Sequence, residues 1–177
     1  RTTAVRVRSL LQVNTMSEPF VIRTAVPDDY RGIATLLAEV DELHRVRLPW
    51  LFRSPTSEPR PHVFFEQLLN GDSSTILVAD AGSIIGVATV LIRTAPEFPV
   101  FVQQTWGVLD NIAVAGTWRR RGVGTALTRA AEAWARQQRV KWLELGVYEL
   151  NHEARAFYAA LGYLPVSTKL RKPLTEG

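Results

Sequence analysis

The sequence predicts a mixed α/β domain, from the size of the chain, its apolar content and the alternation of strand and helix patterns along it. The chain has 177 residues, 46% of them hydrophobic, which suits one domain that folds without disulfides or a structural metal. It has no cysteine, which excludes thiolate catalysis and fits a reducing cytoplasm. No apolar run is long enough to span a membrane, so we expect a soluble protein.

The N-terminal part is expected to hold a strand and two helices. The strand covers 20–25, and the Pro-Asp-Asp sequence at 27–29 has the chemistry of a helix start. The apolar residues that follow recur at helical spacing and are Ile33, Leu36, Leu37 and Val40. Four prolines then make 49–61 an irregular segment. A second helix over 62–70 is expected to stop at Gly71.

The remaining elements alternate between strands and helices. Two β-rich runs over 75–80 and 83–93 predict a hairpin around Gly82, and another strand is expected over 105–115. An apolar stripe over 123–134 is the clearest helix pattern in the chain. The last expected elements are a strand over 141–148, a helix over 151–161 and a strand over 163–170.

The charge of the chain is distributed unevenly. Three arginines and no acidic residue precede Met16, the only methionine. From Met16 onward the chain has 18 basic and 17 acidic residues, a balance that does not predict a nucleic-acid partner. We interpret 1–15 as a leader that is dispensable for activity, with an organelle transit peptide as the alternative. The domain itself is expected over 16–177.

A cluster of arginines and glycines follows the strand expected over 105–115. Arg119, Arg120 and Arg121 precede Gly122 and Gly124, and a helix begins there. A strand that leads through a glycine-rich turn into a helix predicts a phosphate site, because free N–H groups and the helix dipole converge at the turn. The glycines allow close approach of the backbone, and the arginines add charged donors. The alternative is an ordinary helix start with solvated arginines.

Spacing distinguishes this turn from two other phosphate motifs. A dinucleotide-binding fingerprint needs a small residue where Leu127 stands. A nucleoside-triphosphate loop needs Gly-Lys-Ser or Gly-Lys-Thr, which the sequence does not contain. The missing lysine and metal-binding hydroxyl favour a diphosphate held without magnesium. We therefore expect coenzyme A as the ligand and no metal ion.

Two ordered motifs resemble those of one family, the GNAT superfamily of N-acetyltransferases. The run Asp-Asn-Ile-Ala-Val-Ala at 110–115, followed by the arginine-glycine turn, resembles the family's acetyl-CoA-binding core. The run from Asn151 through Phe157 and Tyr158 to Tyr163 resembles its later motif. The resemblance implies a central, mixed, mostly antiparallel sheet flanked by helices. It also implies transfer of an acetyl group from acetyl-CoA to a primary amine of a small molecule or a protein, without nucleic acid or membrane, and it allows a homodimer.

The resemblance further implies roles for individual residues. Main-chain groups of Ile112, Ala113 and Val114 would pair with the pantetheine arm, and Asn151 would orient that arm. Tyr158 would lie near the thioester sulfur and protonate the departing thiolate. The amides that would hold the diphosphate belong to Arg119, Arg120, Arg121, Gly122, Val123, Gly124 and Thr125. Each role has an alternative, since Asn151 can be only a helix cap and Tyr158 only a core residue.

The general base and the acceptor are the least determined parts of the site. We expect Asp110 to be the base, because it shares strand parity with Ile112 and Val114; a solvated strand carboxylate is the alternative. Other candidates for the base are His44, Glu144, Tyr148 and Glu149. The acceptor could be a cationic amine attracted by the acidic residues Glu39, Asp41 and Glu42. A noncatalytic regulator that binds acyl-CoA is the alternative function, and Tyr158 argues against it.

Overall fold

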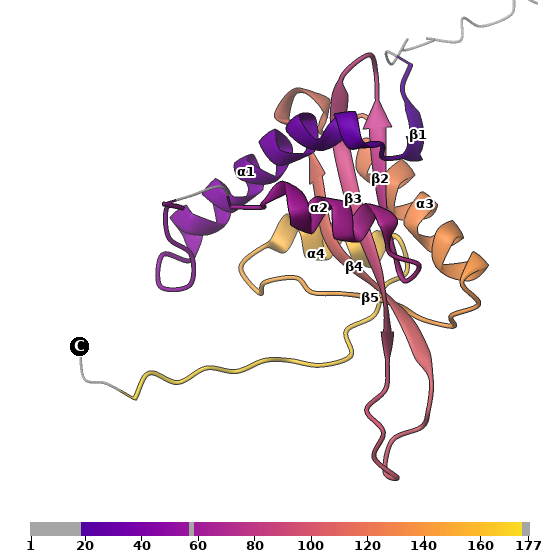
Figure 1. The fold of residues 1–177 in the computed structure, drawn as a ribbon. Helices are drawn as coiled ribbons and strands as arrows, with labels where there is room; N and C mark the ends of the chain where they lie inside the picture. Colours follow the sequence, from indigo (N-terminus) through magenta and orange to yellow (C-terminus); the bar gives the residue numbers. More distant parts are fainter. Residues whose placement is uncertain (1–18, 57–58, 175–177) are drawn as a thin grey trace, which may run out of the picture.

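The computed structural model describes residues 19–56 and 59–174, so the expected leader over 1–15 lies outside the described residues. A five-stranded sheet forms the centre, with its strands in sequence order (Figure 1). The strands are β1 (Val21–Thr24), β2 (Ser74–Asp80), β3 (Ile84–Thr94), β4 (Thr105–Val114) and β5 (Leu143–Leu145). The first four strands pair antiparallel, and β5 pairs parallel with β4. The expected mixed, mostly antiparallel sheet is confirmed.

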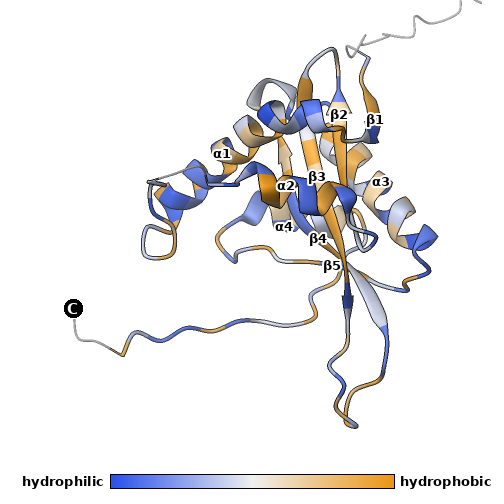
Figure 2. Cartoon of the chain, viewed as in Figure 1, coloured by the Kyte–Doolittle hydropathy of each residue, from blue (hydrophilic) through white to orange (hydrophobic). Residues whose placement is uncertain are grey.

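Strands β2 and β3 are buried on both faces, which explains why they are almost continuously apolar. Side chains of β2 alternate between two core clusters: Ile76 and Val78 belong to one, Leu77 and Ala79 to the other. Val78 and Ala79 are both fully buried. Figure 2 shows the hydrophobic centre of the sheet between more hydrophilic helices.

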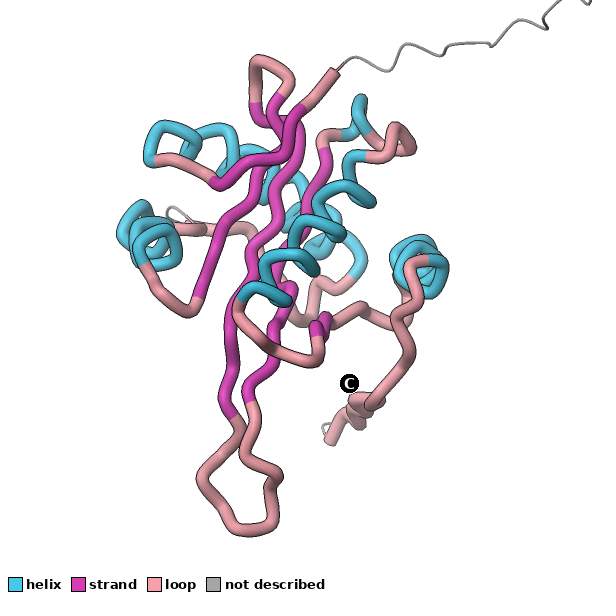
Figure 3. Tube along the Cα trace, turned by 90° about the vertical axis from the view of Figure 1, so that its right-hand side faces the viewer, coloured by secondary structure: helices cyan, strands magenta, loops and turns pink. Residues whose placement is uncertain are grey.

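Helices cover both faces of the sheet. The helices α1 (Tyr30–Arg47) and α2 (His62–Asn70) lie over one face, and α3 (Val123–Gln137) and α4 (His152–Ala160) lie on the other side (Figure 3). Their buried side chains follow this division, since Leu37 and Phe65 join one cluster while Leu127 and Tyr158 join the other. Within the described ranges, no helix is long and apolar enough to cross a bilayer.

An arginine connects the edge strand β1 to the segment before α1. Arg23 donates to both carboxylate oxygens of Asp29, at 2.6 and 2.8 Å, and to Asp80 on β2. The Asp29 carboxylate also accepts from the Val26 N–H at 2.8 Å, which fixes the turn at Pro27–Asp29. Asp29 is only 7% exposed, so its charge is compensated by a partner, as a buried carboxylate requires.

Two strand predictions from the C-terminal part were wrong in whole or in part. The expected strand over 163–170 is absent from the described residues, where 163–174 carries no regular secondary structure. Leu164, Val166 and Leu170 there are more than 80% exposed. The segment has a strand-like pattern but no described strand beside it to pair with, and pattern alone cannot supply that partner. The strand expected over 141–148 is reduced to β5.

Candidate functional site

Strand β4 loses its partner on the β5 side halfway along its length. Pairing with β5 covers only Gly107–Leu109, whereas pairing with β3 continues to Val114. The N–H of Ala115 donates to Ile85 O at 2.9 Å, toward β3. Because alternate residues of an antiparallel strand direct their main-chain groups to opposite sides, those of Ile112 and Val114 point away from β3. The main-chain groups of Ala113 point toward β3. Of the three residues expected to pair with the pantetheine arm, Ile112 and Val114 therefore face the open side of β4 and Ala113 does not.

A β-bulge lies where β4 loses its contact with β5. Leu109 is opposite Val90 and Asn111 is opposite Thr89, so Asp110 is the extra residue with no partner on β3. Bulges re-aim side chains and are common beside functional sites. Simple alternation therefore does not fix the direction of the Asp110 side chain. It is exposed, and one carboxylate oxygen accepts from Asn111 Nδ2 at 2.6 Å.

The arginine-glycine turn has an unusual backbone. Arg120 has φ +62°, although it is not glycine, and Gly122 has φ +84°. A left-handed conformation costs a residue with a side chain about 1–2 kcal/mol, so the turn is held in shape by its surroundings. Gly122 caps α3, and the first bond of the helix joins the Ala126 N–H to Gly122 O. The N–H groups of Val123, Gly124 and Thr125 come before that bond, which leaves them without an intrahelical partner.

The three arginines of the turn have different surroundings. The guanidinium of Arg121 lies over the Trp118 ring, 5.3 Å from its centroid. Arg119 donates from Nε to Val114 O at 3.3 Å, which places it at the open edge of β4. Arg119, Arg120 and Arg121 are all exposed. The expected anionic site is thus a helix start with three exposed arginines, next to strand backbone that has no described strand partner on that side.

Helix α4 supplies Asn151 and Tyr158. The side chain of Asn151 accepts from the Ala154 N–H at 3.2 Å, so its role as a helix cap is confirmed. Tyr158 is 7% exposed and packs edge-on against Tyr163, with ring centroids 5.5 Å apart. Its hydroxyl makes no hydrogen bond to another described residue. Burial raises the pKa of Tyr158 to about 12, which keeps its proton in place at neutral pH.

The other candidates for the base fall into two groups. His44 stacks on Phe52 at 5.1 Å between ring centroids and meets the edge of Tyr148 at 5.5 Å. His44 and Tyr148 were predicted as separate candidates, and no sequence pattern indicated that their rings would be in contact. Burial lowers the pKa of His44, which favours the neutral ring. The two carboxylates form the second group: Glu149 forms an ion pair with Arg155 on α4, and Glu144 is exposed on β5.

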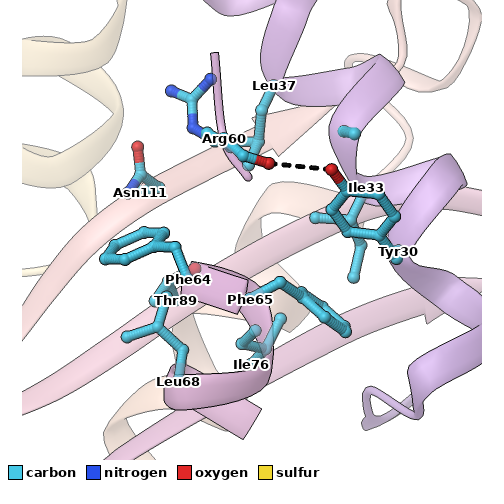
Figure 4. A pocket seen from close by; sticks show the side chains of 11 residues that line it. Tyr30, Ile33, Leu37, Arg60, Phe64, Phe65, Leu68, Ile76, Thr89 and Asn111 are labelled. Carbon is cyan, nitrogen blue, oxygen red and sulfur yellow. Dashed lines mark hydrogen bonds between the residues drawn. The ribbon is translucent and has the colours of Figure 1, made fainter. Parts of the chain in front are cut away.

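A pocket that the sequence analysis missed lies between α1, α2 and the sheet (Figure 4). Its empty volume is about 390 Å³, part of it open to solvent. Phe64 of α2 and Asn111 of β4 both line it, and Asn111 is the residue that contacts the bulged Asp110. The sequence signal that could have indicated it is the pair of adjacent aromatic residues Phe64 and Phe65. Neighbouring residues of a helix point in different directions, so only Phe65 is buried in the core and Phe64 is left exposed. The pocket therefore reaches the same point of β4 as the candidate base.

Comparison with known proteins gives consistent matches. The family model described as the Acetyltransferase (GNAT) family matches residues 37–163. A protein from Bacillus subtilis called an uncharacterized N-acetyltransferase is 27% identical over 143 residues, which are 80% of this chain and 88% of that protein. One from Archaeoglobus fulgidus with the same description is 29% identical over 115 residues, 64% of this chain and 71% of that protein.

A solved structure extends the similarity to the fold. The tetramutant of a Bacillus halodurans protein superposes with a TM-score of 0.81 at 28% identity. The match covers 87% of this chain and 99% of that chain. The similarity therefore spans the sheet and the helices that carry the candidate site.

Proposed function

Because this chain belongs to the GNAT acetyltransferase family, we propose that it transfers an acetyl group from acetyl-CoA to a primary amine. The observation that supports this most directly is a convergence at Gly124. A Cβ atom on Gly124 would meet Phe157 of α4 at 3.6 Å and Val114 of β4 at 3.9 Å. The open edge of β4, the start of α3 and the helix that carries Tyr158 thus adjoin one another.

The chemistry of the chain fits coenzyme A as the acyl carrier. The free N–H groups at the start of α3 suit a diphosphate, and Arg119 and Arg120 add positive charge beside them. Ile112 and Val114 offer main-chain donors and acceptors that a pantetheine amide can pair with, in the manner of an added strand. Acetyl-CoA would supply the acetyl group as a thioester. Its binding needs no metal ion.

Three proton transfers accompany the acetyl transfer, two from the amine nitrogen and one to the sulfur. An alkylamine is mostly protonated at neutral pH, so it must lose a proton before its nitrogen can attack. We propose that Asp110 accepts this proton as the general base, because its carboxylate is solvent-exposed at the bulge. The N–C bond forms as the C–S bond breaks, and the sulfur takes a proton from the Tyr158 hydroxyl. The nitrogen then loses its second proton, which restores the Tyr158 hydroxyl through solvent, so that one proton is released overall. The pKa of Tyr158, about 12, keeps the hydroxyl protonated at neutral pH, so that its proton is present when the thiolate leaves.

The oxyanion that develops on the acetyl group needs a hydrogen-bond donor. The β4 backbone near Val114 is our candidate, because it points away from β3 and has no strand partner there. This assignment uses only main-chain groups. A side-chain substitution at Val114 should therefore affect the rate less than a change that alters the register of β4.

The test measures free CoA released from acetyl-CoA in the presence of a panel of amines. The chain contains no cysteine, so a thiol-reactive dye reports only CoA and the protein adds no background. We expect release that depends on both the protein and the amine, and that falls in Asp110→Asn. Binding of acetyl-CoA by calorimetry without amine-dependent release would instead indicate a regulator. Absence of acetyl-CoA binding would reject both functions.

A further inference from the structure

We propose that the pocket between α1, α2 and β4 receives the apolar part of the acceptor, so that the preferred substrate is a monoamine with an uncharged, aromatic-sized group rather than a polycation. The proposal rests on the proposed acetyl transfer and specifies its substrate class. Four features support it: the position of the pocket, its aromatic wall, the pairing of Arg60 and the lack of a free carboxylate among the described lining residues.

The pocket lies at the point where the reacting amine would have to be. Asn111 and Thr89 both line it, and they are opposite each other across the bulge in the sheet. Asn111 donates to the Asp110 carboxylate and directly precedes Ile112, whose main chain faces the open side of β4. An amine that gives its proton to Asp110 can therefore extend its remaining chain into the pocket.

The wall of the pocket is largely aromatic and aliphatic. Tyr30 and Phe65 pack with their ring centroids 5.5 Å apart, and Leu37 closes the side formed by α1. Phe64 projects over the pocket on the same side as Asn111 in Figure 4. It is 46% exposed and stacks with no other described ring. An exposed phenyl group at the mouth of an apolar pocket suits contact with an apolar ligand.

The charges around the pocket are already compensated. Among the described residues, Arg60 is the only charged one in the lining, and both of its terminal nitrogens pair with the Asp41 carboxylate. The Tyr30 hydroxyl donates to Arg60 O at 2.9 Å, which holds the arginine at the rim. The described part of the lining thus offers no carboxylate to the second ammonium group of a polyamine.

This pairing weakens the expectation that acidic residues on α1 attract a cationic amine. Asp41 is committed to Arg60, and Glu42 is paired with Arg45 on the same helix. Only Glu39 of the three carboxylates has no arginine partner among the described residues, and it does not line the pocket. Removing an ammonium group from water without a counter-charge is costly. The pocket therefore disfavours a second positive charge.

The first experiment compares three amines that share an aminobutyl group: n-butylamine, 4-phenylbutylamine and spermidine. Each of the three offers a primary amine on a butyl chain, and mass spectrometry of the product shows whether spermidine reacts at this end or at its aminopropyl end. Compared at the aminobutyl end, differences in kcat/KM report on the rest of the molecule. We expect 4-phenylbutylamine to exceed the other two by at least about tenfold, because a well-filled apolar pocket discriminates by that order. Equal values for the phenyl and butyl amines, or a preference for spermidine, would overturn the proposal.

The second experiment assigns the preference to the pocket by substituting Phe64. Phe64→Ala should lower kcat/KM for 4-phenylbutylamine at least about tenfold more than it lowers kcat/KM for n-butylamine. Val63→Ala is the matched control, because Val63 is on the same helix, is 60% exposed and does not line the pocket. Melting temperatures of both variants check that they are folded. A loss in Phe64→Ala that is equal for both amines would contradict the assignment.

A binding measurement separates this proposal from the proposed function. Calorimetry with protein saturated with free CoA and titrated with 4-phenylbutylamine needs no turnover. We expect binding that weakens by at least about tenfold in Phe64→Ala. Binding without any CoA release from acetyl-CoA would support the pocket while rejecting the transferase. Release from other amines, with no binding of 4-phenylbutylamine, would reject the pocket and keep the transferase.

Discussion

Gly124 lies against the Phe157 ring, at a distance of 3.6 Å between Phe157 Cζ and the position that a Cβ atom on Gly124 would occupy. This is ordinary van der Waals contact, so a methyl group fits at Gly124 without displacing α4. A longer side chain has to extend beyond the ring into the space in front of the helix start. That space is where we place the diphosphate of CoA.

Gly124→Glu should therefore weaken acetyl-CoA binding by at least about tenfold, because it adds bulk and negative charge where an anion has to approach the helix start. Gly124→Ala is the control, since its methyl group has room beside Phe157. Calorimetry measures both affinities. If Gly124→Glu bound acetyl-CoA as tightly as Gly124→Ala, the turn would not be part of the CoA site.

Gly122 is required for its backbone conformation rather than for space. It has φ +84° and nothing within 4 Å of an added Cβ atom. Gly122→Ala should lower the free energy of unfolding by about 1–2 kcal/mol, measured by urea denaturation. Alanine is strained at this positive φ, and the backbone would shift to relieve that strain. The shift would reorient the N–H groups at the start of α3, so the variant should also raise the KM for acetyl-CoA.

Gly82 provides a matched control for Gly122. It has φ +85°, an equally open Cβ position and a place in the turn between β2 and β3, outside the candidate site. Gly82→Ala should cost a similar unfolding free energy and leave the KM for acetyl-CoA unchanged. Equal KM values for the two variants would show that the conformation of Gly122 serves only the fold.

The contact between Arg23 and Asp29 makes part of the stability depend on pH. Hydrogen bonds from Arg23, and one from the Val26 N–H, lower the pKa of Asp29 below its ordinary value. Because the folded-state pKa is the lower one, the stabilisation is complete above about pH 4 and is lost as the pH falls through the folded-state pKa. Asp29→Asn should cost about 2 kcal/mol at pH 7.

The cost of Asp29→Asn should shrink below about pH 4, where Asp29 becomes protonated in the unfolded chain, and should be smallest below the folded-state pKa. Urea denaturation of both proteins at pH 7 and pH 3 measures the two differences in unfolding free energy. A difference that stays the same at both pH values would indicate that Asp29 acts through packing instead of charge.

Local patterns were sufficient to predict most of the fold. The helix over 62–70 was predicted with its observed bounds, because its proline start, its apolar spacing and its terminal glycine all agree. The predicted strand over 163–170 failed because a strand needs a neighbour, and the sequence of the segment does not specify one. The bulge at Asp110 depends on the register between β3 and β4, which period-two alternation cannot show.

The candidate site was predictable where it depends on neighbours in sequence. The turn from Arg119 to Gly124 was identified because strand, glycines and helix are consecutive. The pocket was not identified, because Arg60, Phe64 and Asn111 come from three elements that only the folded chain brings together. The pairing of Arg60 with Asp41 was missed for the same reason: a loop residue and a helix residue 19 positions apart meet only after folding.

The last prediction concerns Tyr158, which is both a buried ring and a candidate proton donor. Tyr158→Phe keeps almost all of the side-chain volume, so the core should change little. The Tyr158 hydroxyl has no described hydrogen-bond partner to lose. If that hydroxyl protonates the departing thiolate, the variant should lose at least about tenfold in kcat when chemistry limits turnover. Acetyl-CoA affinity should change much less.

Tyr163→Phe is the matched control, because its ring packs against Tyr158 but its hydroxyl donates to Glu132 at 3.3 Å. Its kcat should stay within about twofold of the wild type. The pKa of Tyr158, about 12, keeps the donor protonated throughout the usual assay range. A CoA thiol has a pKa near 8.5, so raising the pH above that value makes thiolate departure less dependent on a donor. The loss of kcat in Tyr158→Phe should therefore diminish between pH 7 and pH 9.5. Normal single-turnover rates of this variant at pH 7 would show that Tyr158 has only a structural role.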